Sequence, residues 1–107
     1  MTTFDEREKG FEVKYKHDQE LRFKVTARRN KLLGLWAAGQ MGLSGADAAA
    51  YATEVVKADF DAPGEEDVIA KVVKDLAAKG SAIGAEEVRK QMALLLERAK
   101  SEIAKGV

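Results

Sequence analysis

The feature that most constrains this chain is a helical pattern that runs from Phe11 to Ala38 without a proline or a cluster of turn residues. Its first half is dense in charge, whereas its second half ends in the stretch RRNKLLGLWAA at residues 28–38, which is apolar from Leu32 onward. Short amphipathic segments follow. We therefore predict one long helix whose C-terminal half lies in a core. Its N-terminal half has no core of its own and forms an arm that reaches a partner.

The composition favours an all-α protein of one domain. The chain has 107 residues, which suits a single modest core, and 34% of them are charged, against a usual share of about 25%. It has no cysteine, which excludes a disulfide framework, a thiolate metal site and a cysteine nucleophile. No apolar run approaches the ~20 residues of a membrane span, and no signal pattern opens the chain. We expect a cytoplasmic protein.

The net charge of zero hides an asymmetry. Residues 1–31 hold nine Lys and Arg against six Asp and Glu, a balance of +3, and residues 32–107 hold nine against twelve, a balance of −3. Such a weak basic excess does not favour nucleic acid, which needs many clustered phosphate contacts. It is enough to steer the arm toward an acidic protein surface.

The arm is expected to be only marginally stable as a helix. Four acid-first pairs at i,i+4 spacing contribute about 0.2–0.5 kcal/mol each. The pairs are Asp5 with Lys9, Glu12 with Lys16, Asp18 with Arg22 and Glu20 with Lys24. Gly10 costs about 1 kcal/mol relative to Ala, and a helix without tertiary contacts is costly to nucleate. We expect a mobile arm, partly disordered alone and helical when a partner covers its apolar side.

Two apolar stripes are predicted on this helix. The first is the core-facing stripe, made of Leu21, Val25, Leu32, Leu35 and Trp36. The second is made of Phe4, Phe11 and Tyr15, and its centre is turned by roughly 80–90° from the first. We interpret the offset as a sign that the aromatic stripe faces a different partner.

The long helix is predicted to end near Gln40 or Met41, with Gly42 in the left-handed position that follows a helix. Ser44 is predicted to cap a second helix that ends at about Asp59. The predicted inward residues of this second helix are Ala48, Tyr51, Ala52, Val55 and Val56.

Two more helices are predicted after the break at Pro63, which suits the first turn of the third helix. This helix ends at Gly80, and Gly84 caps the fourth. The predicted inward residues are Val68, Ile69, Val72, Val73 and Leu76 on the third helix, and Val88, Met92, Leu95, Leu96, Ala99 and Ile103 on the fourth. Short connections favour a compact four-helix bundle, residues 20–107, whose first helix extends into a mobile arm, residues 1–19.

Several conspicuous residues have ordinary structural explanations. His17, the only histidine, is typical of a solvated surface residue in a charged segment and not of a metal ligand or catalytic group. The glycines lack the spacing of a phosphate-binding loop, so helix ending and close packing explain them better. They are Gly34, Gly39, Gly42 and Gly45.

Two charged clusters are also ambiguous. Glu65, Glu66 and Asp67 could bind a cation, although three acids in a first helical turn usually complement the helix dipole. Residues 28–31 could form a nucleic-acid or phosphate patch. The cluster is short and isolated, which favours a solvated face beside the core stripe.

The aromatic stripe of the arm carries the functional prediction. Phe4, Phe11 and Tyr15 could fold back onto the core, but their offset and the surrounding charge favour a partner-binding role. No carboxylate pair, Ser/His/Asp set or metal cluster stands out. The residues therefore predict a helical binding protein and not an enzyme.

Several blocks of sequence are specific enough to indicate a family. They are FDERE at 4–8, FEVKY at 11–15, ARRNKLLGLWAA at 27–38, YA at 51–52, VVKADF at 55–60 and EDV at 66–68. In this order and spacing, over essentially the whole chain, they resemble the zeta subunit of the alphaproteobacterial F1Fo ATP synthase, the inhibitor protein of that enzyme.

The resemblance implies a four-helix body and a mobile inhibitory segment at roughly residues 2–19. That segment would enter a catalytic interface between the alpha and beta subunits of F1 as a helix, close to gamma, and block hydrolytic rotation. The protein would associate peripherally with the inner membrane through F1. Family members have also been linked to nucleotide binding, but the residues place no such site, and no metal or other cofactor is expected.

Within the arm we expect apolar contacts from the three aromatic residues and charged contacts from Arg7, Lys14 and Lys16. The runner-up is a small basic-arm helical protein that binds nucleic acid or ribosomes. It would use Arg22, Lys24, Arg28, Arg29 and Lys31, and its binding would depend steeply on salt.

Overall fold

Four α-helices follow one another along the chain: α1 (Thr3–Gln40), α2 (Gly45–Asp61), α3 (Glu65–Ala78) and α4 (Ala85–Ala104). The computed structural model describes the backbone of residues 3–106 and the side chains of residues 19–106. No strand occurs in the backbone it describes. The prediction of an all-α chain with four helices is confirmed.

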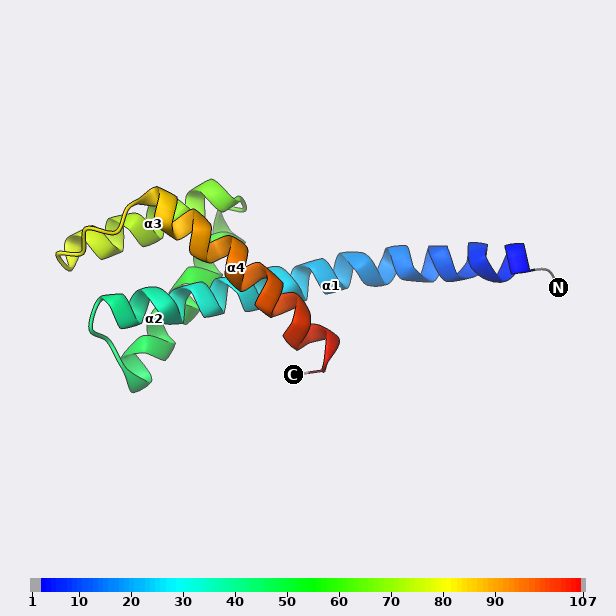
Figure 1. The fold of residues 1–107 in the computed structure, drawn as a ribbon, viewed down its shortest axis with the longest axis horizontal. Coiled ribbons are helices and arrows are strands. Elements are labelled where there is room, and N and C mark those ends of the chain that lie inside the picture. The colour runs from blue at the N-terminus through cyan, green and yellow to red at the C-terminus, as the bar shows by residue number, and fades with distance from the viewer. Residues whose placement is uncertain (1–2, 107) are drawn as a thin grey trace.

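The first helix is much longer than the body that surrounds its C-terminal half. Its 38 residues span about 57 Å at 1.5 Å per residue, close to the 63 Å longest extent of the molecule. Figure 1 shows the N-terminal half of α1 projecting away from the other three helices. The other half packs mainly against α2 and α4, and α4 crosses α1 near the point where the arm leaves the body (Figure 1).

The core of the body draws on all four helices. Its members are Leu33, Ala37 and Ala38 of α1, Tyr51 and Val55 of α2, Val68, Ile69, Val72 and Leu76 of α3, and Val88 and Met92 of α4. Of the inward residues predicted for α2, α3 and α4, Ala48, Val56, Val73, Leu95, Leu96 and Ile103 are half-buried and the rest are buried. The predicted faces of these three helices are therefore confirmed.

The predicted core stripe of α1 is wrong. Leu21 and Leu35 are 41% and 38% exposed, and Trp36 is only half-buried, packed against the edge of the core. The buried face of α1 instead carries Leu33, two alanines, Gly34 and two polar residues. Small residues reduce the hydrophobicity of this face but let neighbouring helices approach closely.

Gly34 marks the closest approach of α1 to α2. A Cβ atom added there would lie 2.6 Å from the Cα atom of Ala52 and 3.2 Å from its Cβ atom. The interpretation that close packing accounts for a glycine in this stretch is confirmed at Gly34.

Glycine also ends two of the helices. Gly42 has φ +80°, and the Leu43 and Gly42 amides donate to the carbonyls of Ala38 and Gly39, the two hydrogen bonds of a Schellman motif. Gly80, at φ +81°, closes α3 with the same pattern. Both helix endings were predicted from the sequence.

The helix starts differ in detail from their predictions. Ser44 does precede α2, but its side chain makes no capping hydrogen bond, and α2 continues past Asp59 to Asp61. Pro63 lies outside α3, because Gly64, at φ +143°, takes the N-cap position. Gly84 precedes α4 as predicted.

Gly34→Ala should destabilise the body by about 1–3 kcal/mol, because the new methyl group forces α1 and α2 apart. Gly39→Ala is the matched control, since an added Cβ there meets nothing within 4 Å. It should be neutral or should stabilise the helix by about 0.5–1 kcal/mol. Urea unfolding followed by circular dichroism measures both, and equal stability of the two variants would contradict the close approach.

Candidate functional site

The arm carries the predicted partner-binding residues. Phe4, Arg7, Phe11, Lys14, Tyr15 and Lys16 belong to helix α1, but their side chains, like that of His17, lie outside the described residues. The partner-binding role of these six residues stays a prediction. What the structure adds is the geometry at the base of the arm, where α1 joins the body.

The base of the arm is solvent-exposed on all sides at residues 19–24 and becomes buried within the next two turns. Phe23 is 64% exposed, whereas Arg29 and Asn30 are 4% and 1% exposed. The change from an exposed to an enclosed helix therefore takes place over residues 25–30.

Arg29 and Asn30 form a buried polar network that joins three helices. The Nε and Nη2 atoms of Arg29 donate to Oδ1 of Asn30, at 3.2 and 3.0 Å, and its Nη1 atom donates to Oε1 of Glu65 at 3.2 Å. The Nδ2 atom of Asn30 donates to Oδ2 of Asp59 at 2.8 Å. Asp59 in turn accepts from the Gly64 amide at 3.2 Å. The network holds α1 to the end of α2 and the start of α3.

The prediction that residues 28–31 form a solvated face is therefore wrong for Arg29 and Asn30. A buried charge is stable only when it is paired and hydrogen-bonded, and Glu65 and Asn30 meet that need. Glu65 and Glu66 also explain the acidic first turn of α3, since Glu66 accepts from Arg89 of α4 at 2.7 Å. Lys31 remains exposed.

A second ion-pair cluster holds α1 to α4. Arg28 Nη1 lies 2.9 Å from Oε1 of Glu102, and Arg98 Nε lies 2.9 Å from Oε2 of the same carboxylate. The hydrogen bond from Arg98, followed by that from Arg28, holds the pKa of Glu102 below its usual range. Together with the Arg29 network, this cluster fixes the direction in which α1 leaves the body.

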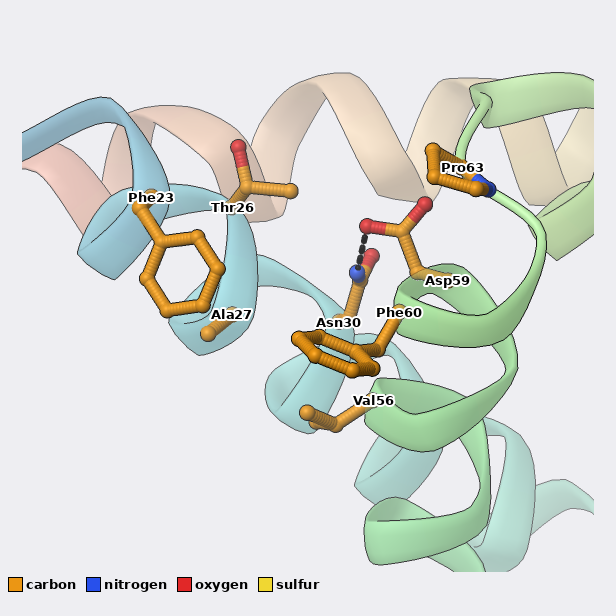
Figure 2. Close-up of a pocket in the computed structure, with 8 residues that line it drawn as sticks. All are labelled: Phe23, Thr26, Ala27, Asn30, Val56, Asp59, Phe60 and Pro63. Atoms are coloured by element: carbon orange, nitrogen blue, oxygen red, sulfur yellow. Dashed lines mark hydrogen bonds between the residues drawn. The ribbon is translucent and has the colours of Figure 1, made fainter. Parts of the chain in front are cut away.

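An apolar groove lies beside the base of the arm, between α1 and α2 (Figure 2). It has a volume of about 320 Å³. Its lining residues are Phe23, Thr26, Ala27 and Asn30 of α1, Val56, Asp59 and Phe60 of α2, and Pro63. Phe60 is 72% exposed, so two large aromatic side chains face solvent at one place.

The sequence analysis did not select Phe23 or Phe60 as site residues. Each stands alone among charged neighbours, Phe23 between Arg22 and Lys24 and Phe60 between two aspartates. A single phenylalanine between charged residues was the only sequence signal for an exposed aromatic side chain. Only the tertiary structure brings the two rings to one groove.

A separate polar contact joins α2 to α3 away from the arm. The Tyr51 hydroxyl donates to Oδ2 of Asp75 at 2.8 Å, and Lys71 pairs with the same carboxylate at 3.0 Å. Burial, aided by the Asp75 carboxylate, raises the pKa of Tyr51. The tyrosine therefore stays protonated and acts as a structural donor.

Asn30→Ala should cost about 1–3 kcal/mol of unfolding free energy, because it removes a partner from both the buried Arg29 guanidinium and Asp59. The adjacent exposed residue supplies the control: Lys31→Ala should change stability by less than about 0.5 kcal/mol. Urea unfolding of both variants checks this. A loss no larger than that of the control would mean that the network does not hold α1 in place.

Glu102→Gln should change how stability depends on pH. The folded-state pKa of Glu102 lies below its ordinary value of 4.5, so its contribution to stability is present above pH 4.5 and is lost as the pH falls through the folded-state pKa. The variant should therefore be less stable at pH 7 and lose less stability on acidification. Thermal unfolding from pH 7 to pH 2 measures this, with Glu97→Gln, an exposed carboxylate of the same helix, as the control.

Comparison with solved structures gives a close relative. A protein whose structure was determined in solution by NMR is 47% identical to this chain, with a TM-score of 0.71. The match covers 81% of this chain and 99% of the other. Comparison with curated proteins yields no significant match.

Among the described residues, no helix is both long and apolar enough to cross a membrane.

The chain also matches the sequence model of a protein family over almost its full length. The family is that of the ATPase inhibitor subunit zeta, and its model covers residues 1–102. With the matching length, the four helices and the projecting first helix in view, the chain belongs to the ATPase inhibitor subunit zeta family.

Proposed function

We propose that this protein inhibits ATP hydrolysis by inserting the arm, as a helix, into a catalytic interface between the alpha and beta subunits of F1, close to gamma. A helix wedged in that interface blocks the rotation that accompanies hydrolysis. The protein is then a regulatory subunit whose attachment to the inner membrane is through F1. Membership of the inhibitor family supports the ATPase as the partner.

One observation carries the proposal: α1 is a single helix of which one half is fixed in the body and the other projects beyond it (Figure 1). Asn30 holds the fixed half to α2, Arg29 holds it to α3 and Arg28 holds it to α4. A helix held in this way presents its free end to a partner in a defined direction.

The fixed half also lowers the cost of ordering the arm. Nucleating a helix is unfavourable, whereas each further residue adds one hydrogen bond to a helix that already exists. The packed residues of α1 serve as that nucleus. Binding therefore needs to supply only the cost of extending the helix toward Thr3.

The apolar residues of the arm are not sufficient to hold it. Burying Phe4, Phe11 and Tyr15 contributes roughly 1.5–3 kcal/mol each. Ordering the backbone opposes this by about 1–2 kcal/mol per residue at most, over many residues. Charged contacts must make up the difference, and Arg7, Lys14 and Lys16 are placed among the aromatic positions to supply them.

The nucleic-acid alternative loses support at the base of the arm. Of the five basic residues it would use, Arg28 and Arg29 are engaged with Glu102 and Glu65 inside the protein. Arg22, Lys24 and Lys31 are exposed. Three separated cations are few for phosphate binding, which depends on many contacts.

Phe11→Ala and Tyr15→Ala should each weaken inhibition of the cognate F1-ATPase by about tenfold, or about 1.4 kcal/mol, because each removes buried aromatic area. The measurement is the concentration that halves ATP hydrolysis. Val13→Ala is the matched control, since position 13 lies on the opposite side of the helix and should leave inhibition unchanged. Unfolding midpoints should be the same for all three variants.

Raised salt should also weaken wild-type inhibition, because it screens the attraction between the basic arm and an acidic surface. A Phe11→Ala, Tyr15→Ala double variant that inhibits at the wild-type concentration would contradict the proposed role of the arm. Inhibition would then come from the body.

A further inference from the structure

Two exposed phenylalanines are not explained by the fold or by the arm. Phe23 and Phe60 are 64% and 72% exposed, and both line the groove, Phe23 from α1 and Phe60 from α2 (Figure 2). They come from different helices and are 37 positions apart in sequence. Exposed apolar side chains that gather at one hollow mark an interaction surface.

The hydrogen-bonding groups of the groove are already engaged within the protein. Asn30 uses its amide to donate to Asp59 and its carbonyl oxygen to accept from Arg29. The second carboxylate oxygen of Asp59 accepts from the Gly64 amide. The walls are otherwise apolar, except for the Thr26 hydroxyl. This arrangement suits apolar side chains better than a small polar ligand, which needs free groups to orient it.

The groove lies beside the face of α1 that continues the aromatic positions of the arm. Positions 11, 15, 22, 29 and 33 follow one another at spacings of four and seven residues, which keeps them on one face of a helix. Arg29 and Leu33 at the end of this series are buried in the body. The aromatic positions of the arm therefore share a side of α1 with Arg29 and Leu33, which lie at one edge of its buried face.

A surface that follows this face along α1 reaches one edge of the groove, at Thr26. From Tyr15 it passes Arg22 and then reaches Thr26, which lies one turn further on and lines the groove with Phe23. Beyond Thr26 the face is covered by the body itself. The end of α2, with Phe60, stands at the edge of that covered region (Figure 2).

We infer that the ATPase surface that holds the arm continues onto the body, and that apolar side chains of the same ATPase occupy the groove between Phe23 and Phe60. The inference rests on the proposed function. The groove is then a second contact on one continuous interface. The arm is the inserted part of that interface, and the groove is the part through which the body binds the ATPase.

A photo-crosslinking experiment tests the contact directly. The photoreactive amino acid p-benzoylphenylalanine is introduced at position 60 of the full-length chain, and at position 94 as the control. Leu94 is 61% exposed on α4 and does not line the groove. On irradiation with cognate F1, position 60 should form an adduct with an F1 subunit and position 94 should not. No adduct from position 60 in a complex that is fully inhibited, or an adduct with a second copy of this chain alone, overturns the inference.

Substitution tests the contribution of the groove to binding. Phe60→Ala and Phe23→Ala should each raise the half-inhibitory concentration by about five- to tenfold, as expected for a truncated aromatic anchor. Leu94→Ala should leave it unchanged. Because both phenylalanines are largely exposed, the unfolding midpoints should remain those of the wild type.

The outcomes separate this inference from the proposed function. Wild-type inhibition by a Phe23→Ala, Phe60→Ala double variant, with loss of inhibition in the Phe11→Ala, Tyr15→Ala variant, overturns the groove contact and leaves the arm in place. If only the Phe23→Ala, Phe60→Ala variant loses inhibition, the groove contact is supported and the inhibitory role proposed for the arm is contradicted.

Discussion

The close approach of α1 to α2 at Gly34 is the contact on which the rest of the structure depends. Only glycine lets the α1 backbone come this near to Ala52, and the buried alanines beyond it keep the helices together. One turn earlier, the same approach brings Asn30 to Asp59. The polar network at the base of the arm is thus a consequence of how tightly the two helices pack.

This network gives the long helix a fixed end. Arg29 is buried and makes hydrogen bonds to Asn30 of α1 and Glu65 of α3. Arg28 pairs with Glu102 of α4. A single contact would let α1 pivot, whereas contacts to α2, α3 and α4 together define its direction. Under the proposed insertion of the arm, a defined direction of α1 reduces the conformational freedom lost on binding.

The helical phase connects the arm to the body. The aromatic positions of the arm lie in register with the buried Arg29 and Leu33, so a partner bound to the arm takes the side of α1 on which the body itself packs further along. The groove with Phe23 and Phe60 stands at the boundary between the two. Under the proposed function, the body would then contact the partner through the groove while the arm is inserted.

The sequence by itself determined the helices and most of their ends. Charge density, the absence of proline and regular apolar spacing defined α1, and Gly42 and Gly80 marked two helix ends because their left-handed backbone is costly for other residues. The inward faces of α2, α3 and α4 followed from periodicity, because large apolar residues dominate them. The family was also recognisable from its sequence blocks.

Only the tertiary structure decided which face of α1 is buried. Periodicity selected Leu21 and Leu35, since it weighs apolar size, but the buried face holds a glycine, alanines, Arg29 and Asn30. Small residues are favoured there by close helix approach, and the polar pair is stable because Asp59 and Glu65 reach it from other elements. Neither cause is local in sequence. The groove could not be predicted for the same reason, because Phe23 and Phe60 line one groove only when α1 and α2 pack together.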